Sequence, residues 1–113
     1  MAGMNGGAPH ATIEVTERDA GHWTAKISGE LDIVSVEGFR GPIDDLLARP
    51  AQRVDLDVSG LDFMDSSGLA VLLRLADRFG PLRVFGASTM VRRVIEATGL
   101  SKILLLDGEA PPP

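Results

Sequence analysis

The sequence predicts a single α/β (α+β) domain in which a mixed β-sheet is covered by helices mainly on one face. Two segments near the N-terminus alternate apolar and polar residues and are separated by a short turn, which predicts an antiparallel hairpin. The later strand-like segments are joined through segments with helical spacing, so they are expected to run parallel. The element order is β-β-α-β-α-β-α-β, and 113 residues suffice for one domain with its own core.

The first two strands are predicted directly by their alternation. Residues 1–10 are Gly-rich and unpatterned, and we expect them to form a flexible tail. Residues 11–16 alternate apolar with Thr and Glu side chains, and residues 23–32 repeat this pattern more clearly. The turn at residues 19–21 contains Gly and is short enough to join the two segments as a hairpin.

The first helix is predicted with an interruption. Residues 34–49 have helical spacing, but Gly38, Gly41 and Pro42 fall inside the segment. Because proline lacks the N–H donor and suits the first helical turn, the firm helix is expected to begin at Pro42. Its buried face would consist of Ile43, Leu46 and Leu47.

The next segment predicts a strand, a loop and a second helix. Residues 54–58 alternate Val and Leu with Asp, which is typical of a half-buried strand. A Gly-containing loop follows, and residues 67–79 then have one apolar face. Gly80-Pro81 ends this helix, and residues 82–85 form a short strand.

The C-terminal part predicts a third helix and a last strand. Ser88 or Thr89 caps the helix, and Gly99 fits the left-handed position after its end. The strand at residues 102–106 is a continuous apolar run, which predicts burial on both faces. Residues 108–113 are expected to form a flexible, Pro-rich tail.

Composition excludes several classes of function. The chain has no cysteine, which excludes disulfides, thiolate catalysis and cysteine-ligated metals. No apolar run approaches the ~20 residues of a membrane span, and the N-terminus lacks the features of a signal peptide, so we expect a cytoplasmic protein without a membrane partner. The net charge of -5 argues against nucleic-acid binding. Neither phosphate-binding glycine motif nor His-rich metal spacing occurs, so no cofactor is expected.

The most informative segment is Asp65-Ser66-Ser67-Gly68, at the junction of a strand and a helix. Such residues commonly cap helices by accepting hydrogen bonds from the first-turn amides, and Ser67 is the better candidate for that role. The same position suits a phosphoserine, because a helix N-terminus tolerates an added phosphate. A phosphate on Ser66 would add ~2 negative charges near Asp65 and Asp62 and would convert a surface that docks a partner into one that repels it.

A nucleophilic serine is a weaker alternative. The glycine pattern of a hydrolase elbow is only half present around Ser66. A general base is also missing, because His10 lies in the tail and His22 is expected to be an ordinary surface residue. Asp55 and Asp57 share one face of a strand and are interpreted as a solvated polar face.

Three segments together resemble a known family, and the first two are its specific motifs. Gly29-Glu30-Leu31-Asp32 ends the second strand, Asp65-Ser66-Ser67-Gly68 begins the second helix, and Thr98-Gly99-Leu100 ends the third. In order and spacing they resemble the STAS-domain anti-anti-sigma factors, also called anti-sigma factor antagonists. The resemblance covers residues 11–107 and implies a STAS-like mixed sheet.

The resemblance implies a non-enzymatic phosphoswitch. Ser66 would be phosphorylated by an anti-sigma factor that is itself an ATP-dependent serine kinase, and a PP2C-type phosphatase would reverse the modification. The unphosphorylated chain, expected to be a monomer when free, would bind the anti-sigma factor and release a sigma factor. The implied partner-binding residues come from both motifs: Gly29, Glu30, Leu31, Asp32, Met64, Asp65, Ser66, Ser67 and Gly68.

The sequence departs from this family in one respect. Members usually end with a further helix after the last strand, whereas residues 107–113 offer none. Some relatives with the same fold serve as scaffolds or accessory modules of stress-signalling or transporter complexes. That role is the main alternative, and a serine hydrolase is a minor one.

Overall fold

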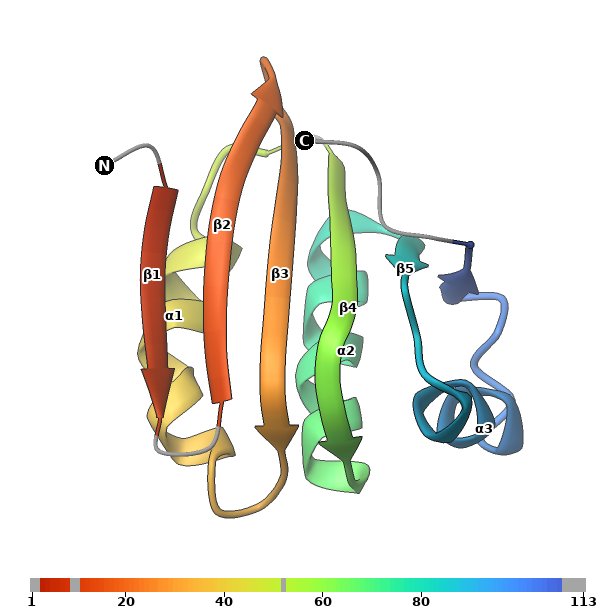
Figure 1. Ribbon diagram of the computed structural model, residues 1–113. Coiled ribbons are helices and arrows are strands. Elements are labelled where there is room, and N and C mark those ends of the chain that lie inside the picture. The colour runs from red at the N-terminus through yellow and green to blue at the C-terminus, as the bar shows by residue number, and fades with distance from the viewer. Residues whose placement is uncertain (1–2, 9–10, 52, 109–113) are drawn as a thin grey trace.

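The computed structural model describes residues 3–8, 11–51 and 53–108, and its strands form one six-stranded sheet in the order β1-β2-β3-β4-β5-β6 (Figure 1). The predicted order of elements is confirmed, with one strand added at its start. The strands are β1 (Gly3–Ala8), β2 (Ala11–Asp19), β3 (His22–Leu31), β4 (Arg53–Met64), β5 (Leu82–Phe85) and β6 (Leu104–Leu106). The helices are α1 (Val36–Leu47), α2 (Ser66–Phe79) and α3 (Thr89–Ala97).

The sheet is mixed, as predicted. β1, β2 and β3 pair antiparallel, and β3, β4, β5 and β6 pair parallel. α1 and α2 lie behind the same face of the sheet (Figure 1). Because β3 and β4 are parallel neighbours, their carboxyl ends lie side by side at one end of the strands, where Leu31 pairs with Met64.

The core lies between the sheet and the helices. Alternate apolar residues of β2 and β3 are buried in the core, namely Ala11, Ile13, Val15, Ala25, Ile27 and Leu31. The largest fully buried side chains include Ile13, Ile27, Leu31, Phe39, Ile43, Leu46, Leu56, Leu61, Met64, Leu72, Leu75 and Leu82.

The predicted flexible tail is wrong for Gly3–Ala8, which forms the edge strand β1. β1 pairs with β2 from Gly3 opposite Thr16 to Ala8 opposite Ala11. This pairing joins main-chain groups and therefore needs no alternation of side chains, which explains why the Gly-rich sequence gave no strand signal.

The predicted start of the first helix at Pro42 is wrong, because α1 begins at Val36 and contains Pro42 in its interior. Phe39 is fully buried in the first half of α1, on the same face as Ile43 and Leu46. Burial of this aromatic ring stabilises the segment that propensity alone disfavours. Leu47, the third residue of the predicted face, is partly buried.

The predicted Gly-containing loop after residue 58 is also absent, since β4 continues to Met64. Two shifts in the register with β3, between Lys26 and Ser28 and between Gly29 and Glu30, accommodate the extension. Only Asp65 therefore separates β4 from α2, which fixes the first turn of α2 to the end of the strand.

The remaining elements agree closely with the sequence, with one exception. α2 and β5 end where predicted, Ser88 caps α3 by accepting from the amide of Val91 (3.2 Å), and Gly99 has φ 74°. The prediction that the last strand is buried on both faces is wrong, because β6 lies at the sheet edge. Leu104 is buried, whereas Ile103 and Leu105 are 41% and 38% exposed.

In the described part of the chain, no helix is long and apolar enough to cross a membrane. Residues 109–113, which make up most of the predicted C-terminal tail, lie outside the described residues.

The face of the sheet away from α1 and α2 is polar, but it is not simply solvated. Asp55 was predicted to belong to a solvated face, yet it is only 3% exposed. His22 covers it, with its Nε2 2.8 Å from Asp55 Oδ2, and Arg53 Nε donates to Asp55 Oδ1 at 3.4 Å. The interpretation of His22 as an ordinary surface residue is therefore wrong, because β3 places it beside the first residues of β4.

We expect His22→Ala to destabilise the fold, because it deprives the buried Asp55 carboxylate of its shortest hydrogen bond. The free energy of unfolding should fall by about 1–3 kcal/mol, measured by urea denaturation. Arg40→Ala is the control, because Arg40 forms an exposed ion pair with Glu37 at 3.5 Å, and its loss should change stability by less than about 0.5 kcal/mol. Equal effects of the two variants would contradict a structural role for His22.

Candidate functional site

The candidate site lies where β4 ends and α2 begins. Ser66 is the first residue of α2 and is exposed. Ser67 follows it in the same turn, while Gly68 and Leu69 are buried. The chain thus presents the hydroxyl of Ser66 to solvent on a turn that is anchored to the core immediately afterwards.

Asp65 caps α2. Its Oδ1 accepts hydrogen bonds from the amides of Ser67 (2.8 Å) and Gly68 (3.2 Å). The expectation that Ser67 is the cap is wrong: Asp65 has the extended backbone conformation of a capping residue, whereas Ser67 already lies within the helix. Because Asp65 satisfies these amides, the hydroxyls of Ser66 and Ser67 are not needed for capping.

The motif at the end of β3 lies directly against this turn. The amide of Asp65 donates to the carbonyl of Leu31 (3.3 Å). A Cβ on Gly68 would overlap this same carbonyl oxygen and the side chain of Met64. The structure therefore brings the two predicted motifs together, although the roles of their residues in partner binding stay predictions.

The segment between β3 and α1 is held in place by hydrogen bonds. Asp32 Oδ1 accepts from the amides of Val34 and Ser35, both at 3.0 Å. The hydroxyl of Ser35, a fully buried residue, donates to the carbonyl of Glu30 (2.7 Å) and accepts from the amide of Asp32 (3.0 Å). Asp65 Oδ2 accepts from the amide of Ile33 (3.2 Å), which joins this segment to the serine turn.

Three apolar residues at the site were missed by the sequence analysis. Ile33 and Val34 are 75% and 65% exposed, and Phe63, two residues before Asp65, is 43% exposed. We call the adjacent residues Ile33 and Val34 the docking patch. The signal was present in the sequence, because Ile33 and Val34 follow the strand as two adjacent apolar residues that fit neither a strand nor a helix face.

The described residues place no general base beside Ser66. His22 lies at the start of β3, at the opposite end of the parallel pair from Ser66, and its Nε2 contacts Asp55. His10 lies outside the described residues. Within residues 3–8, 11–51 and 53–108 there is also no group of three His, Cys, Asp or Glu residues able to hold a metal ion.

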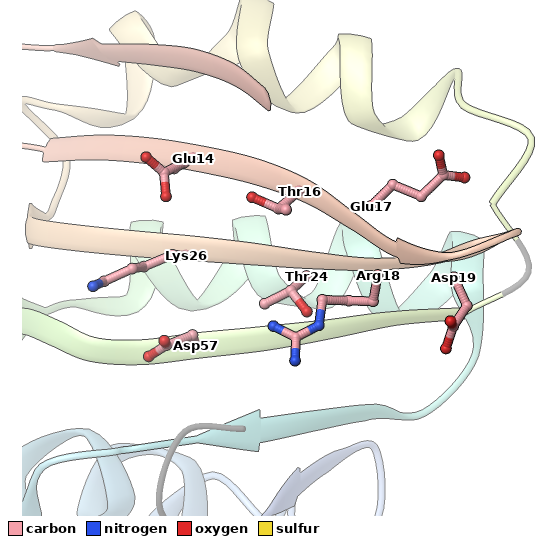
Figure 2. Close-up of a pocket in the computed structure, with 8 residues that line it drawn as sticks. All are labelled: Glu14, Thr16, Glu17, Arg18, Asp19, Thr24, Lys26 and Asp57. Carbon is pink, nitrogen blue, oxygen red and sulfur yellow. The ribbon is translucent and has the colours of Figure 1, made fainter. Parts of the chain in front are cut away.

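A polar pocket lies on the sheet face formed by β2, β3 and β4 (Figure 2). Figure 2 shows Lys26 of β3 between Glu14 of β2 and Asp57 of β4. These two residues are the register partners of Lys26 on the neighbouring strands. Toward the turn between β2 and β3, Arg18 extends over Thr24 (Figure 2). The pocket residues come from the strands and not from the serine turn, so the pocket is a separate feature of the molecule.

The structure thus combines a mixed sheet with an exposed serine on a capped helix N-terminus and two exposed apolar side chains on the neighbouring segment. The chain belongs to the STAS domain family, whose model matches residues 13–109.

Several of its relatives are anti-sigma factor antagonists. An anti-sigma-B factor antagonist of Listeria monocytogenes is 30% identical over 97 residues, which cover 82% of this chain and 85% of the relative. The anti-sigma-F factor antagonist RsfB of Mycobacterium tuberculosis is 26% identical over 98 residues, or 84% of this chain and 80% of RsfB.

Solved structures agree with these sequence relatives. An anti-sigma factor antagonist from Mycobacterium paratuberculosis superposes with a TM-score of 0.76 at 27% identity, covering 92% of this chain and 90% of that one. Unphosphorylated SpoIIAA, also an anti-sigma factor antagonist, has a TM-score of 0.71 at 22% identity, covering 87% and 88%. At 22% identity, the likeness to SpoIIAA shows a shared fold only.

Gly68→Ala is expected to destabilise the protein, because the added methyl group would push α2 away from the end of β3. Overpacking of this kind costs about 1–3 kcal/mol, to be measured by chemical denaturation. Gly108→Ala is the control: Gly108 is exposed, and apart from its chain neighbours a Cβ there meets no atom within 4 Å, so the substitution should change stability by less than about 0.5 kcal/mol. Equal effects of the two substitutions would contradict the close packing at Gly68.

Proposed function

We propose that the chain is an anti-sigma factor antagonist switched by phosphorylation of Ser66. The observation that supports this function best is the exposed hydroxyl of Ser66 beside both the Gly29–Asp32 motif and the docking patch. The similarity to anti-sigma factor antagonists of Listeria and Mycobacterium supports the class of partner.

The unphosphorylated form is the binding form. An apolar patch contributes to affinity when it is removed from water, and a neutral serine beside it can be buried at low cost. Phosphorylation of Ser66 adds ~2 negative charges, which the partner would have to desolvate together with the patch. Asp65 is adjacent and Asp62 is exposed on β4, so like-charge repulsion adds to the effect.

ATP would supply the phosphoryl group. An anti-sigma factor that acts as a serine kinase would bind ATP and magnesium and transfer the group to the hydroxyl of Ser66. A PP2C-type phosphatase would restore the binding form. We place this cycle in the cytoplasm, with the free antagonist as a monomer.

The phosphorylation site is tested with the host's anti-sigma factor kinase and ATP, followed by mass spectrometry. We expect a single phosphate on Ser66, none on Ser66→Ala, and unchanged modification of Ser67→Ala, because Asp65 and not Ser67 caps the helix. Phosphate retained by Ser66→Ala would refute the assignment. Failure of the kinase to bind either form would favour the alternative of a scaffold in a larger assembly.

Binding to the same kinase tests the switch and the docking patch by calorimetry. Ser66→Asp should weaken binding by repulsion. Ile33→Glu should weaken binding at least about tenfold, because it would place a charge where the partner buries an apolar side chain in the complex. Leu105→Glu is the control, since Leu105 is also exposed but lies on β6. Equal losses in the Ile33 and Leu105 variants would contradict a specific docking patch.

A further inference from the structure

We propose that Asp65 is a positioning residue that holds the apolar docking patch at a fixed place beside Ser66. This inference rests on the proposed function and identifies how the partner surface is organised. The two oxygens of the Asp65 carboxylate accept hydrogen bonds from different parts of the chain. Oδ1 accepts from the amides at the start of α2, and Oδ2 accepts from the segment that carries Ile33 and Val34.

The segment at residues 32–35 carries two exposed β-branched side chains but no regular structure of its own. Asp32 and Ser35 fix its two ends through the bonds to Val34, Ser35 and Glu30. The amide of Ile33 donates to Asp65 Oδ2 at 3.2 Å. This bond is thus the side-chain link between the tip of the segment and the serine turn.

A carboxylate at residue 65 does what other capping residues cannot. Serine, threonine and asparagine each offer one acceptor to the first-turn amides, and that is enough for a cap. A second acceptor for Ile33 requires the second oxygen of aspartate, because the amide nitrogen of asparagine is a donor. The geometry therefore separates the capping role of Asp65 from its role at the docking patch.

Holding the patch in advance has a consequence for binding. A segment that is already ordered loses less conformational entropy when a partner covers it, so affinity rises without any added contact. Loss of the Oδ2 bond should therefore weaken docking of the partner. It should leave the phosphoryl transfer itself unchanged, because Ser66 would still lie on a capped helix.

The test is Asp65→Asn, which keeps one acceptor for Ser67 and Gly68 and removes the acceptor for Ile33. In the protein alone, amide hydrogen exchange by NMR should show protection of Ile33 reduced about fivefold, the size expected for one lost hydrogen bond, with Ser67 little changed. With the host's anti-sigma factor kinase, KM should rise about fivefold and kcat should stay within about twofold.

Asp57→Asn is the matched control, because Asp57 is an aspartate on β4 whose Oδ1 also accepts from nearby groups, the amide and hydroxyl of Ser59. It should change neither Ile33 protection nor KM. If Asp65→Asn does not fold, Asp65→Ser replaces it, since a hydroxyl also caps a helix. Unchanged protection of Ile33, or a fall in kcat instead of a rise in KM, would overturn the proposal. The exchange measurement needs no kinase, so it tests the positioning role even if the proposed function is wrong.

Discussion

The parallel pairing of β3 with β4 is the constraint on which the candidate site depends. It aligns Leu31 with Met64, so that the segments following both strands leave the sheet at the same edge. α2 then starts so close to β3 that only glycine fits at residue 68. Two motifs more than thirty residues apart in the chain become one surface because the ends of two strands are hydrogen-bonded neighbours.

Within that surface, charge and hydroxyl groups have separate tasks. The carboxylate of Asp65 accepts the hydrogen bonds of the first-turn amides. The hydroxyl of Ser66 is therefore not needed as a helix cap, and Ser66 remains exposed. If a serine capped the helix, modification would replace its hydroxyl acceptor with phosphate oxygens, and the contacts of the helix N-terminus would change. Here a phosphate would alter the charge of the surface while α2 keeps its start.

The sequence predicted strands β2 to β6 and the second and third helices, because each depended on local periodicity or on connection rules. The shared surface of the two motifs was implied by the family resemblance. It failed where tertiary packing decides. Phe39 stabilises the first turns of α1 despite Pro42. Register shifts in the pairing of β3 with β4 allow β4 to continue to Met64. Asp55 was misjudged because its partner His22 comes from another strand, and no pattern within one segment reports such a pair.

The position of the docking patch depends on contacts from another part of the chain. Ile33 and Val34 are apolar and exposed, yet their segment is tied to the fold through Asp32, Ser35 and Asp65. A surface loop without a partner gains nothing from holding two apolar side chains in water, since burial is what makes them favourable. Under the proposed function, the anti-sigma factor would cover these two apolar side chains together with Ser66, and their burial in the complex would contribute to affinity.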